Sequence, residues 1–345
     1  MKENLFIIGT RPEITKIAPV ANKLNCKILF TGQHFSKSMT EGFFDLIKNK
    51  EIINLNLQKF KNFSESERYL IHKITEVINK VNPKRVVVLG DTNSTLLGAI
   101  ASKNINKELY FLESGMRSKD IQQIEEYNRL IVSHLADLNF CNHKSNKINL
   151  INEGINKNKI VVTGSTVFSS VLLVDKNLNK NYDENYILCT LHRPENVDNK
   201  SQLISLLKTV NKLNFKTIFP IHPRTKAILS DFDTKSLKNI KFIKPQNYQD
   251  FLELIQKSTF IISDSGGIQE ESAIYKKPLL IPRLHTERPE MLGIFNLLVK
   301  NNIELYREAK SILMKDSPLL PTVKSSKLLY GKEKAIELIV KKFDE

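Results

Sequence analysis

Cysteine is scarce in this sequence, with three residues among 345: Cys26, Cys141 and Cys189. An odd number of scattered cysteines does not make a disulfide framework, which excludes a disulfide-rich secreted domain. Each cysteine stands in an apolar segment, a position that favours a plain buried thiol. We therefore expect a reduced, cytoplasmic protein.

Long hydrophobic runs are also absent. No window reaches the roughly 18 uninterrupted apolar residues that a membrane-spanning helix needs. The apolar run in the N-terminal segment MKENLFIIGTRPE is too short for the core of a signal peptide. Hydrophobic residues make up 41% and charged residues 26% of the chain, which is ordinary globular composition. We expect a globular protein with no membrane partner.

Several sequence signatures of cofactor binding are missing. There is no C-x-x-C pair and no H-E-x-x-H, and the seven histidines are dispersed, so no metal site is expected. There is no G-x-x-x-x-G-K-[ST] and no G-x-G-x-x-G, which argues against a P-loop NTPase and against a nicotinamide cofactor. We expect no cofactor.

Positive charge is the unusual feature that is present. Lysine and arginine number 52 against 37 aspartate and glutamate, a net charge of +15. Such an excess is compatible with nucleic acid, an anionic membrane or an anionic small substrate. The basic residues are mostly lysines scattered among asparagines, without an arginine-rich block, so a solvated basic surface is favoured over nucleic-acid binding. A nucleic-acid-binding protein is kept as the non-enzymatic alternative.

Short apolar segments alternate with helical patterns along the chain. This alternation predicts an α/β protein with parallel sheets covered on both faces. The predicted strands of the first half are Asn4–Gly9, Lys27–Gly32, Arg85–Gly90, Glu108–Glu113, Asp137–Asn142 and Lys159–Gly164. Those of the second half are Tyr186–Leu191, Lys216–Ile221, Ile240–Ile243, Thr259–Ser263, Pro278–Pro282 and Asn296–Val299. Helices are predicted at Pro12–Leu24, Ser66–Asn82, Ser94–Lys103 and Glu125–Leu135.

The polar, turn-rich stretch Asp175–Asn185 predicts the connection between two domains. We expect two doubly wound Rossmann-like domains, residues 1–170 and 171–330, facing a cleft. In open α/β sheets the ligand lies beyond the carboxyl ends of the strands, so the chemistry is expected just after strands and toward that cleft.

The segment Gly9–Glu13 follows the first predicted strand and opens a helix. Arg11 and Lys16 would lie near the helix N-terminus, where the helix dipole already favours anions. The segment is either a plain strand-to-helix turn or half of a phosphate or carboxylate site.

Three acidic residues follow strands or open a helix in the first half. Asp91 is either a helix N-cap or a carboxylate aimed into the cleft. Glu113 follows a strand and precedes a Ser-Gly pair, which capping explains less well. Glu125 is either the partner of Arg129 in a surface ion pair or a third site carboxylate. Together they predict an acid–base cluster, because neighbouring carboxylates push their pKa values apart.

The second half carries a pair of basic residues and a glycine-rich turn. His192 and Arg193 follow a strand and favour an anion site, and the segment Ile221–Arg224 repeats this layout. Ser265, Gly266 and Gly267 open a helix with bare backbone N–H groups, an arrangement that cradles a pyrophosphate.

Two further residues complete the predicted nucleotide site. Glu271, further along the same helix, is suited to accept two ribose hydroxyls. Arg288 follows the next strand and adds a cation near the phosphates.

Taken together, the motifs resemble those of the non-hydrolysing UDP-N-acetylglucosamine 2-epimerases. The matching segments are GTRPEITKIAPV, GDTNST, ESGMRS, EEYNR, VTGSTV, LHRPEN, SDSGGIQEESAIYKKPLLIPR and TERPE, in the order of that family. The resemblance implies a two-domain glycosyltransferase-B-like fold. In that fold the C-terminal helix, here Lys332–Phe343 within residues 331–345, returns to the first domain. It also implies a homodimer.

The resemblance implies inversion of UDP-GlcNAc at C2 to UDP-ManNAc, for glycan precursor synthesis, by elimination of UDP to 2-acetamidoglucal and re-addition. The first domain would act on the sugar and the second would bind UDP. The implied catalytic residues are Asp91, Glu113, Glu125 and His192. The implied substrate-binding residues are Arg11, Lys16, Arg129, Arg193, Ser265, Gly266, Gly267, Glu271 and Arg288. Alternatives are a 2-epimerase of a related UDP sugar, such as UDP-2,3-diacetamido-2,3-dideoxyglucuronate, a hydrolysing relative and a glycosyltransferase of the same fold.

The sequence departs from the family pattern in a few places. Ser114 and Met116 replace the usual small and aliphatic residues, Ile124 stands where proline is common, and Tyr127 is bulky. The segment after Gln33–His34 lacks the basic residue that bacterial members use for a second, regulatory UDP-GlcNAc, so that regulatory site is not expected.

Overall fold

The computed structural model describes residues 3–32, 43–55, 63–175, 185–331 and 334–345. It divides into two compact units, Met1–Leu173 with Tyr330–Glu345, and Val174–Leu329. Most of the predicted connection Asp175–Asn185 lies outside the described residues, as does the segment after Gln33–His34.

The first unit is built on a parallel seven-stranded sheet in the order β3-β2-β1-β4-β5-β6-β7. Its strands are β1 (Asn4–Ile8), β2 (Cys26–Phe30), β3 (Ile52–Asn54), β4 (Arg85–Leu89), β5 (Glu108–Leu112), β6 (Leu138–Cys141) and β7 (Ile160–Val162). Its helices are α1 (Arg11–Ala21), η1 (Phe44–Leu46), α3 (Phe63–Val81), α4 (Asn93–Asn104), α5 (Ile124–Leu135), α6 (Lys144–Asn152), η2 (Lys157–Lys159), α7 (Val167–Val174) and the C-terminal α15 (Lys334–Asp344).

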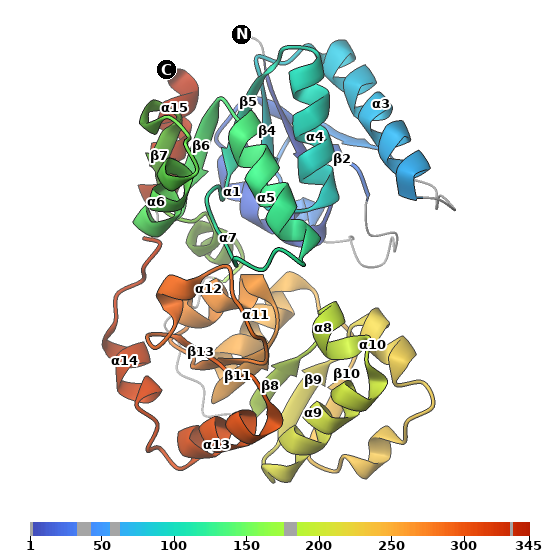
Figure 1. Cartoon of the computed structure of the whole chain (residues 1–345), viewed down its shortest axis with the longest axis vertical. Coiled ribbons are helices and arrows are strands. Elements are labelled where there is room, and N and C mark those ends of the chain that lie inside the picture. The colour runs from blue at the N-terminus through green and yellow to red at the C-terminus, as the bar shows by residue number, and fades with distance from the viewer. Residues whose placement is uncertain (1–2, 33–42, 56–62, 176–184, 332–333) are drawn as a thin grey trace. The chain divides into compact units, whose positions relative to one another are not determined.

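Both faces of this sheet are covered, as near-continuous apolar strands require. Alternate strand residues such as Leu5 and Ile7 pack with side chains of α3, α4 and α5, which Figure 1 shows in front of the sheet. Phe6, one residue out of phase, stacks with Phe343 of α15, with ring centroids 6.5 Å apart. Arg85 anchors the same helix by donating from Nη1 to the Phe343 carbonyl oxygen at 2.5 Å.

The second unit carries a parallel six-stranded sheet in the order β10-β9-β8-β11-β12-β13. Its strands are β8 (Ile187–Thr190), β9 (Thr217–Pro220), β10 (Ile240–Ile243), β11 (Phe260–Ser263), β12 (Leu279–Ile281) and β13 (Asn296–Leu298). Its helices are α8 (Pro194–Val197), α9 (Lys200–Lys212), α10 (Pro223–Ile228), η3 (Thr234–Ser236), α11 (Tyr248–Lys257), α12 (Gly266–Ile274), η4 (Pro289–Met291), α13 (Asn302–Leu313) and α14 (Leu319–Ser325). Leucines of α9 and α13 pack on one face of this sheet.

Each sheet has a point where the chain reverses the direction in which it adds strands. In the first unit this point lies between β1 and β4, and in the second between β8 and β11. Ligands of open α/β sheets bind outside the carboxyl ends of the strands at such switch points. The fold therefore directs attention to the residues that follow these four strands.

The α/β prediction with parallel sheets is confirmed, and every predicted strand is present, with ends shifted by at most two residues. One short strand, β3, was not predicted, because Ile52–Asn54 at the sheet edge is only three residues long and none of its side chains is fully buried. Within the described residues, the helix predicted at Lys332–Phe343 begins at Lys334.

No helix in the described part of the chain combines the length and apolarity needed to cross a membrane.

Candidate active site

The turn between β1 and α1 is held by a buried glutamate. Thr10 occupies the N-cap position of α1, and Glu13 Oε2 accepts hydrogen bonds from the backbone N–H groups of Gly9 at 2.6 Å and Thr10 at 2.7 Å. Burial raises the pKa of Glu13 and outweighs these hydrogen bonds, and the nearby Asp91 carboxylate raises it further. The turn thus fixes the start of the helix that carries Arg11 and Lys16.

Arg11 itself is half-buried. Its guanidinium carbon lies 5.4 Å from the centroid of the Phe43 ring, and burial lowers its pKa.

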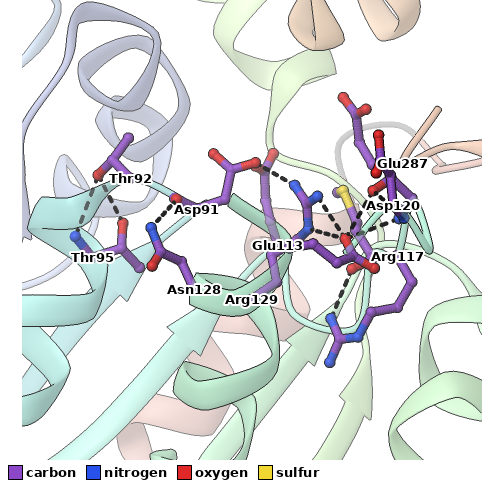
Figure 2. Close-up of polar contacts among 12 residues, drawn as sticks. Asp91, Thr92, Thr95, Glu113, Arg117, Asp120, Asn128, Arg129 and Glu287 are labelled. Carbon is purple, nitrogen blue, oxygen red and sulfur yellow. Dashed lines mark hydrogen bonds and ion pairs between the residues drawn. The ribbon is translucent and has the colours of Figure 1, made fainter. Parts of the chain in front are cut away.

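Asp91 follows β4 at the switch point. The N-cap alternative is wrong, because Thr92 Oγ1 caps α4 by accepting from the Thr95 backbone N–H at 3.3 Å. The Asp91 carboxylate instead forms an ion pair with Arg129 Nη1, and its backbone carbonyl accepts from Asn128 Nδ2 at 2.8 Å (Figure 2). With 32% of its side chain exposed, Asp91 is oriented by α5 and open to solvent.

Glu113 follows β5, the strand paired with β4. Leu89 and Leu112 are partners in that pairing, so Asp91 and Glu113 leave neighbouring strand ends. Glu113 has a backbone φ of 63°, in the left-handed region that a non-glycine residue adopts only at a cost of about 1 kcal/mol or more. Its buried carboxylate accepts from Lys16 Nζ at 2.6 Å through Oε2, while Oε1 has no hydrogen-bond partner among the described residues.

An uncompensated buried carboxylate oxygen on a strained backbone is typical of a functional group rather than a structural one.

Arg129 is buried on α5 rather than on the surface, and its pairing with Glu125 stays a prediction. Besides Asp91, it pairs with Glu126, whose Oε2 lies 2.7 Å from Arg129 Nη2. Burial raises the pKa of Glu126, but Arg129 and the backbone N–H groups of Ser118 and Lys119 outweigh it and lower the pKa. Glu125 lies half-buried in the first turn of α5.

The residues that depart from the family pattern are either buried in the first unit or half-exposed on α5. Ser114 is fully buried, and its Oγ donates to Asn139 Oδ1 at 2.6 Å, so a hydroxyl is accommodated where a smaller side chain is usual. Met116 is buried as well. Ile124 and Tyr127 are half-exposed on α5, which explains how an atypical shape fits there.

His192 follows β8 and meets Asp264, which follows β11. The Nδ1 atom of His192 lies 3.1 Å from Asp264 Oδ1, and the Asp264 side chain is fully buried. Burial alone would raise the pKa of Asp264, but the charge of His192 and the surrounding N–H donors lower it to about 2. Arg193 is half-buried, and its backbone N–H donates to Asp264 Oδ2 at 3.0 Å.

Of the second basic segment, Ile221–Arg224, His222 lies near the His192–Asp264 pair and Arg224 has a different partner. The His222 ring centroid lies 5.7 Å from that of His192, whereas Arg224 forms an exposed ion pair with Asp198.

The predicted glycine-rich turn does open a helix. Ser265 is the N-cap residue of α12, without a side-chain capping bond, and Gly266 and Gly267 form its first turn. A Cβ at Gly266 would lie 2.1 Å from Glu287 Oε1, so a larger residue there would have to displace the Glu287 carboxylate. A Cβ at Gly267 would meet no atom within 4 Å, so there is open space beside this glycine. The nine-residue helix α12 begins here, and the N–H groups of a helix's first turn are the arrangement that binds anions.

Arg288 is buried beside this turn. It forms ion pairs with Glu270 at 2.8 Å and with Glu287 at 2.8 Å, and its Nη1 atom would lie 3.2 Å from a Cβ at Gly266. Glu271, one turn further along α12, is half-buried and hydrogen-bonds Tyr248. Burial, together with the Glu271 carboxylate, raises the pKa of the Tyr248 phenol well above its usual value.

Comparison with known protein families identifies the family of this chain. The family model described as UDP-N-acetylglucosamine 2-epimerase matches residues 19–344. The chain belongs to the UDP-N-acetylglucosamine 2-epimerase family.

Two curated members illustrate the range of this family. The chain is 37% identical to the UDP-N-acetylglucosamine 2-epimerase of Methanocaldococcus jannaschii, over 90% of this chain and 91% of that protein. It is 33% identical to the UDP-2,3-diacetamido-2,3-dideoxy-D-glucuronate 2-epimerase of Pseudomonas aeruginosa, over 84% and 85% of the two chains.

The fold matches a solved epimerase with ligands bound. The crystal structure of the Methanocaldococcus jannaschii UDP-GlcNAc 2-epimerase in complex with UDP-GlcNAc and UDP has a TM-score of 0.88 and 34% identity. The match covers 100% of this chain and 99% of that one. The predicted epimerase resemblance is thereby confirmed.

The sequence of this member of the epimerase family did not reveal several buried carboxylates, among them Glu126 and Asp264. Glu126 was passed over in favour of its neighbour Glu125, although the helical period of α5 places residue 126 on the same face as the buried Arg129. Asp264 stands inside the Ser-Asp-Ser-Gly-Gly motif, in which the glycines give the stronger sequence signal. An acid placed directly after a buried strand was the available signal.

The remaining cofactor and thiol predictions concern groups outside these clusters. In the described part of this epimerase-family chain, no group of three or more histidine, cysteine, aspartate or glutamate side chains is placed to hold a metal ion. All three cysteines are free and buried, which confirms the prediction of plain buried thiols. Burial raises the pKa of Cys26 to about 11 and that of Cys141 to about 12.

Proposed function

We propose that this chain interconverts UDP-GlcNAc and UDP-ManNAc, as a non-hydrolysing 2-epimerase, by eliminating UDP to 2-acetamidoglucal and adding it back. The observation that carries the proposal is Glu113. It combines a left-handed backbone, a lysine partner on Oε2 and a buried oxygen without a partner among the described residues. The family of the chain, and solved relatives with UDP-GlcNAc bound, support a UDP sugar as the substrate.

The first unit supplies the proton-handling groups in this proposal. The hydrogen on C2 of the sugar is weakly acidic, so its removal needs a positioned base, and return from the other face needs a second group. Asp91, Glu113 and Glu125 are the candidates for these roles. Arg129 orients Asp91 and Lys16 orients Glu113, while Arg11 extends the cationic surroundings.

The second unit holds the nucleotide in this proposal. The N–H groups of Ser265, Gly266 and Gly267 bind the diphosphate, because anions are stabilised at a helix N-terminus. Glu271 accepts the ribose hydroxyls. The basic residues on this unit, His192, Arg193 and Arg288, stabilise the negative charge that develops as UDP departs, which lowers the barrier for breaking the C1–O bond.

NMR of the reaction in deuterium oxide tests the activity. UDP-GlcNAc should give UDP-ManNAc, and deuterium should appear at C2 of both sugars during turnover. Absence of both product and exchange would refute the epimerase. UDP-2,3-diacetamido-2,3-dideoxyglucuronate in a parallel reaction identifies a preference for that sugar, and release of free ManNAc identifies a hydrolysing enzyme.

A role in glycan precursor synthesis, cytoplasmic location and a homodimer complete the proposal. Location is supported by three buried free thiols and by the nucleotide-sugar substrate. The homodimer is supported by apolar side chains exposed along one face of α5, namely Ile124, Tyr127 and Ile131. Sedimentation at micromolar concentration should give twice the 39.6 kDa chain mass, and a monomer would contradict the dimer.

A further inference from the structure

The pairing of β8 with β11 brings two functional side chains together. Thr190 lies opposite Ser263 in this register, and their hydroxyl oxygens are 2.8 Å apart. Both strands end at this step, so the chain delivers His192 and Asp264 from adjacent strand ends at the switch point of the sheet.

The fully buried side chain of Asp264 accepts several hydrogen bonds. Its Oδ1 atom faces His192 Nδ1 at 3.1 Å, and its Oδ2 atom accepts from the backbone N–H groups of His192 at 3.1 Å and Arg193 at 3.0 Å. Asn196 Nδ2 donates to the same oxygen at 3.0 Å. These donors hold the carboxylate in one orientation, and with the pKa lowered to about 2 it is ionised at neutral pH.

An ionised carboxylate can only accept hydrogen bonds. The contact between Asp264 Oδ1 and His192 Nδ1 therefore requires a proton on Nδ1. Two other ionisable groups lie near His192, namely the His222 ring, whose centroid is 5.7 Å from that of His192, and the neighbouring Arg193. Asp264 is thus the group that determines which ring nitrogen of His192 carries the fixed proton.

We propose that Asp264 is a positioning residue of the epimerase, which keeps a proton on Nδ1 of His192 so that Nε2 is the nitrogen that serves the departing diphosphate. In the complex with the anionic diphosphate, the His192 ring carries a proton on each nitrogen, with Nδ1–H facing Asp264 and Nε2–H facing a diphosphate oxygen. When the C1–O bond breaks, its electron pair remains on that oxygen, and Nε2–H donates a hydrogen bond to it. Asp264 neither gains nor loses a proton. This inference rests on the proposed function, which gives His192 its diphosphate.

Steady-state kinetics on UDP-GlcNAc test the coupling of the two residues. Asp264→Asn should lower kcat on the order of 10²-fold, the usual cost of one lost charge-stabilising donor, with KM changed far less. If Asp264 acts through His192, the double variant His192→Gln/Asp264→Asn should be no slower than His192→Gln. Losses that multiply would overturn the proposal. Asp198→Asn makes the same chemical change in the exposed pair with Arg224, and it should keep wild-type kcat.

Histidine 15N NMR supplies a readout that a merely structural role would not move. In the substrate-free wild type at alkaline pH, the signals absent from His192→Gln should show a protonated Nδ1 and a bare Nε2. Asp264→Asn should move the proton to Nε2, because an asparagine amide no longer requires a donor at Nδ1. A wild-type spectrum with Nδ1 bare would overturn the proposal by itself, whether or not the variant folds.

The two measurements separate failure of the inference from failure of the proposed function. A wild type that epimerises UDP-GlcNAc without the expected tautomer refutes the role of Asp264. A wild type with the expected tautomer but no C2 exchange refutes the epimerase and, with it, the assignment of Nε2 to a diphosphate.

Discussion

At the scale of single residues, the site is built from charges that are held by partners rather than left in water. Glu113 meets Lys16, Asp91 meets Arg129 and Asp264 meets His192, and each contact joins residues far apart in the sequence. Fixed partners reduce the reorganisation needed when charge moves during a reaction. Substitutions at these residues should therefore change chemistry more than ligand binding.

Glu113→Gln should lower turnover of UDP-GlcNAc by roughly 10³-fold, because it removes a proton-handling carboxylate without changing its size. UDP binding, measured by calorimetry, should stay nearly at the wild-type value. Glu76→Gln on the exposed face of α3 is the matched control and should leave both quantities unchanged. Strong loss of UDP binding with unaltered turnover at saturation would contradict the role of Glu113.

Asp264 also makes a prediction for acid stability. Its pKa falls from 3.8 to about 2 on folding, so its stabilising contribution is complete above pH 3.8 and disappears as the pH falls toward 2. The shift corresponds to about 2 kcal/mol. Urea midpoints measured from pH 6 to pH 2.5 should fall less steeply for Asp264→Asn than for the wild type. Parallel curves would show that the folded-state pKa is not lowered.

At the scale of elements, loops after strands are tied to one another by buried side chains. Glu13 of α1 accepts from Gly9 and Thr10 in its own turn and from Thr92 Oγ1, the cap of α4, at 2.8 Å. One carboxylate thereby joins the ends of β1 and β4, the two strands at the switch point. The pKa of Glu13 is raised because burial of its carboxylate disfavours the charged form.

Removing the Glu13 carboxylate should destabilise the turns that follow β1 and β4. Glu13→Ala leaves two buried backbone N–H groups unsatisfied and should cost about 2–4 kcal/mol of stability in the first unit, measured by urea unfolding. Glu13→Gln keeps an accepting oxygen and should cost clearly less. Equal losses for the two variants would show that the hydrogen bonds are not what matters.

The elements also show how far the sequence could be read. Apolar runs and turn residues were sufficient to predict the strands of both sheets except β3, because buried parallel strands are almost uniformly apolar. They could not predict register, and register is what places Asp264 against His192 and Asp91 beside Glu113. For the same reason Asp91 remained ambiguous until Thr92 was seen to cap α4. The pairing of Arg129 with Glu126 was not predicted, because the pattern alone does not show which carboxylate is buried.

At the scale of the whole molecule, the net charge of +15 resolves into two populations. A few cations, among them Lys16, Arg129 and Arg288, are buried or half-buried in pairs with carboxylates. Many of the rest are lysines on solvated faces, where screening by salt weakens their field.

This division predicts the behaviour toward nucleic acid. Binding to a fluorescent 30-mer duplex should be detectable near 20 mM salt and should vanish near 150 mM, because scattered lysines yield only a few phosphate contacts. UDP binding should decline far less over the same range, since its ligands are localised. Tight duplex binding at physiological salt, seen by anisotropy, would restore the nucleic-acid alternative.

The buried thiols have a practical consequence for the whole molecule. Thiolates, not thiols, react with maleimides and disulfides, and burial raises the pKa of all three cysteines. The native chain should therefore be almost inert to labelling reagents while folded. A single cysteine introduced on an exposed helix face, for example at Glu76, would be the one fast-reacting thiol. A fluorophore could then be attached to the first unit without first removing the natural cysteines.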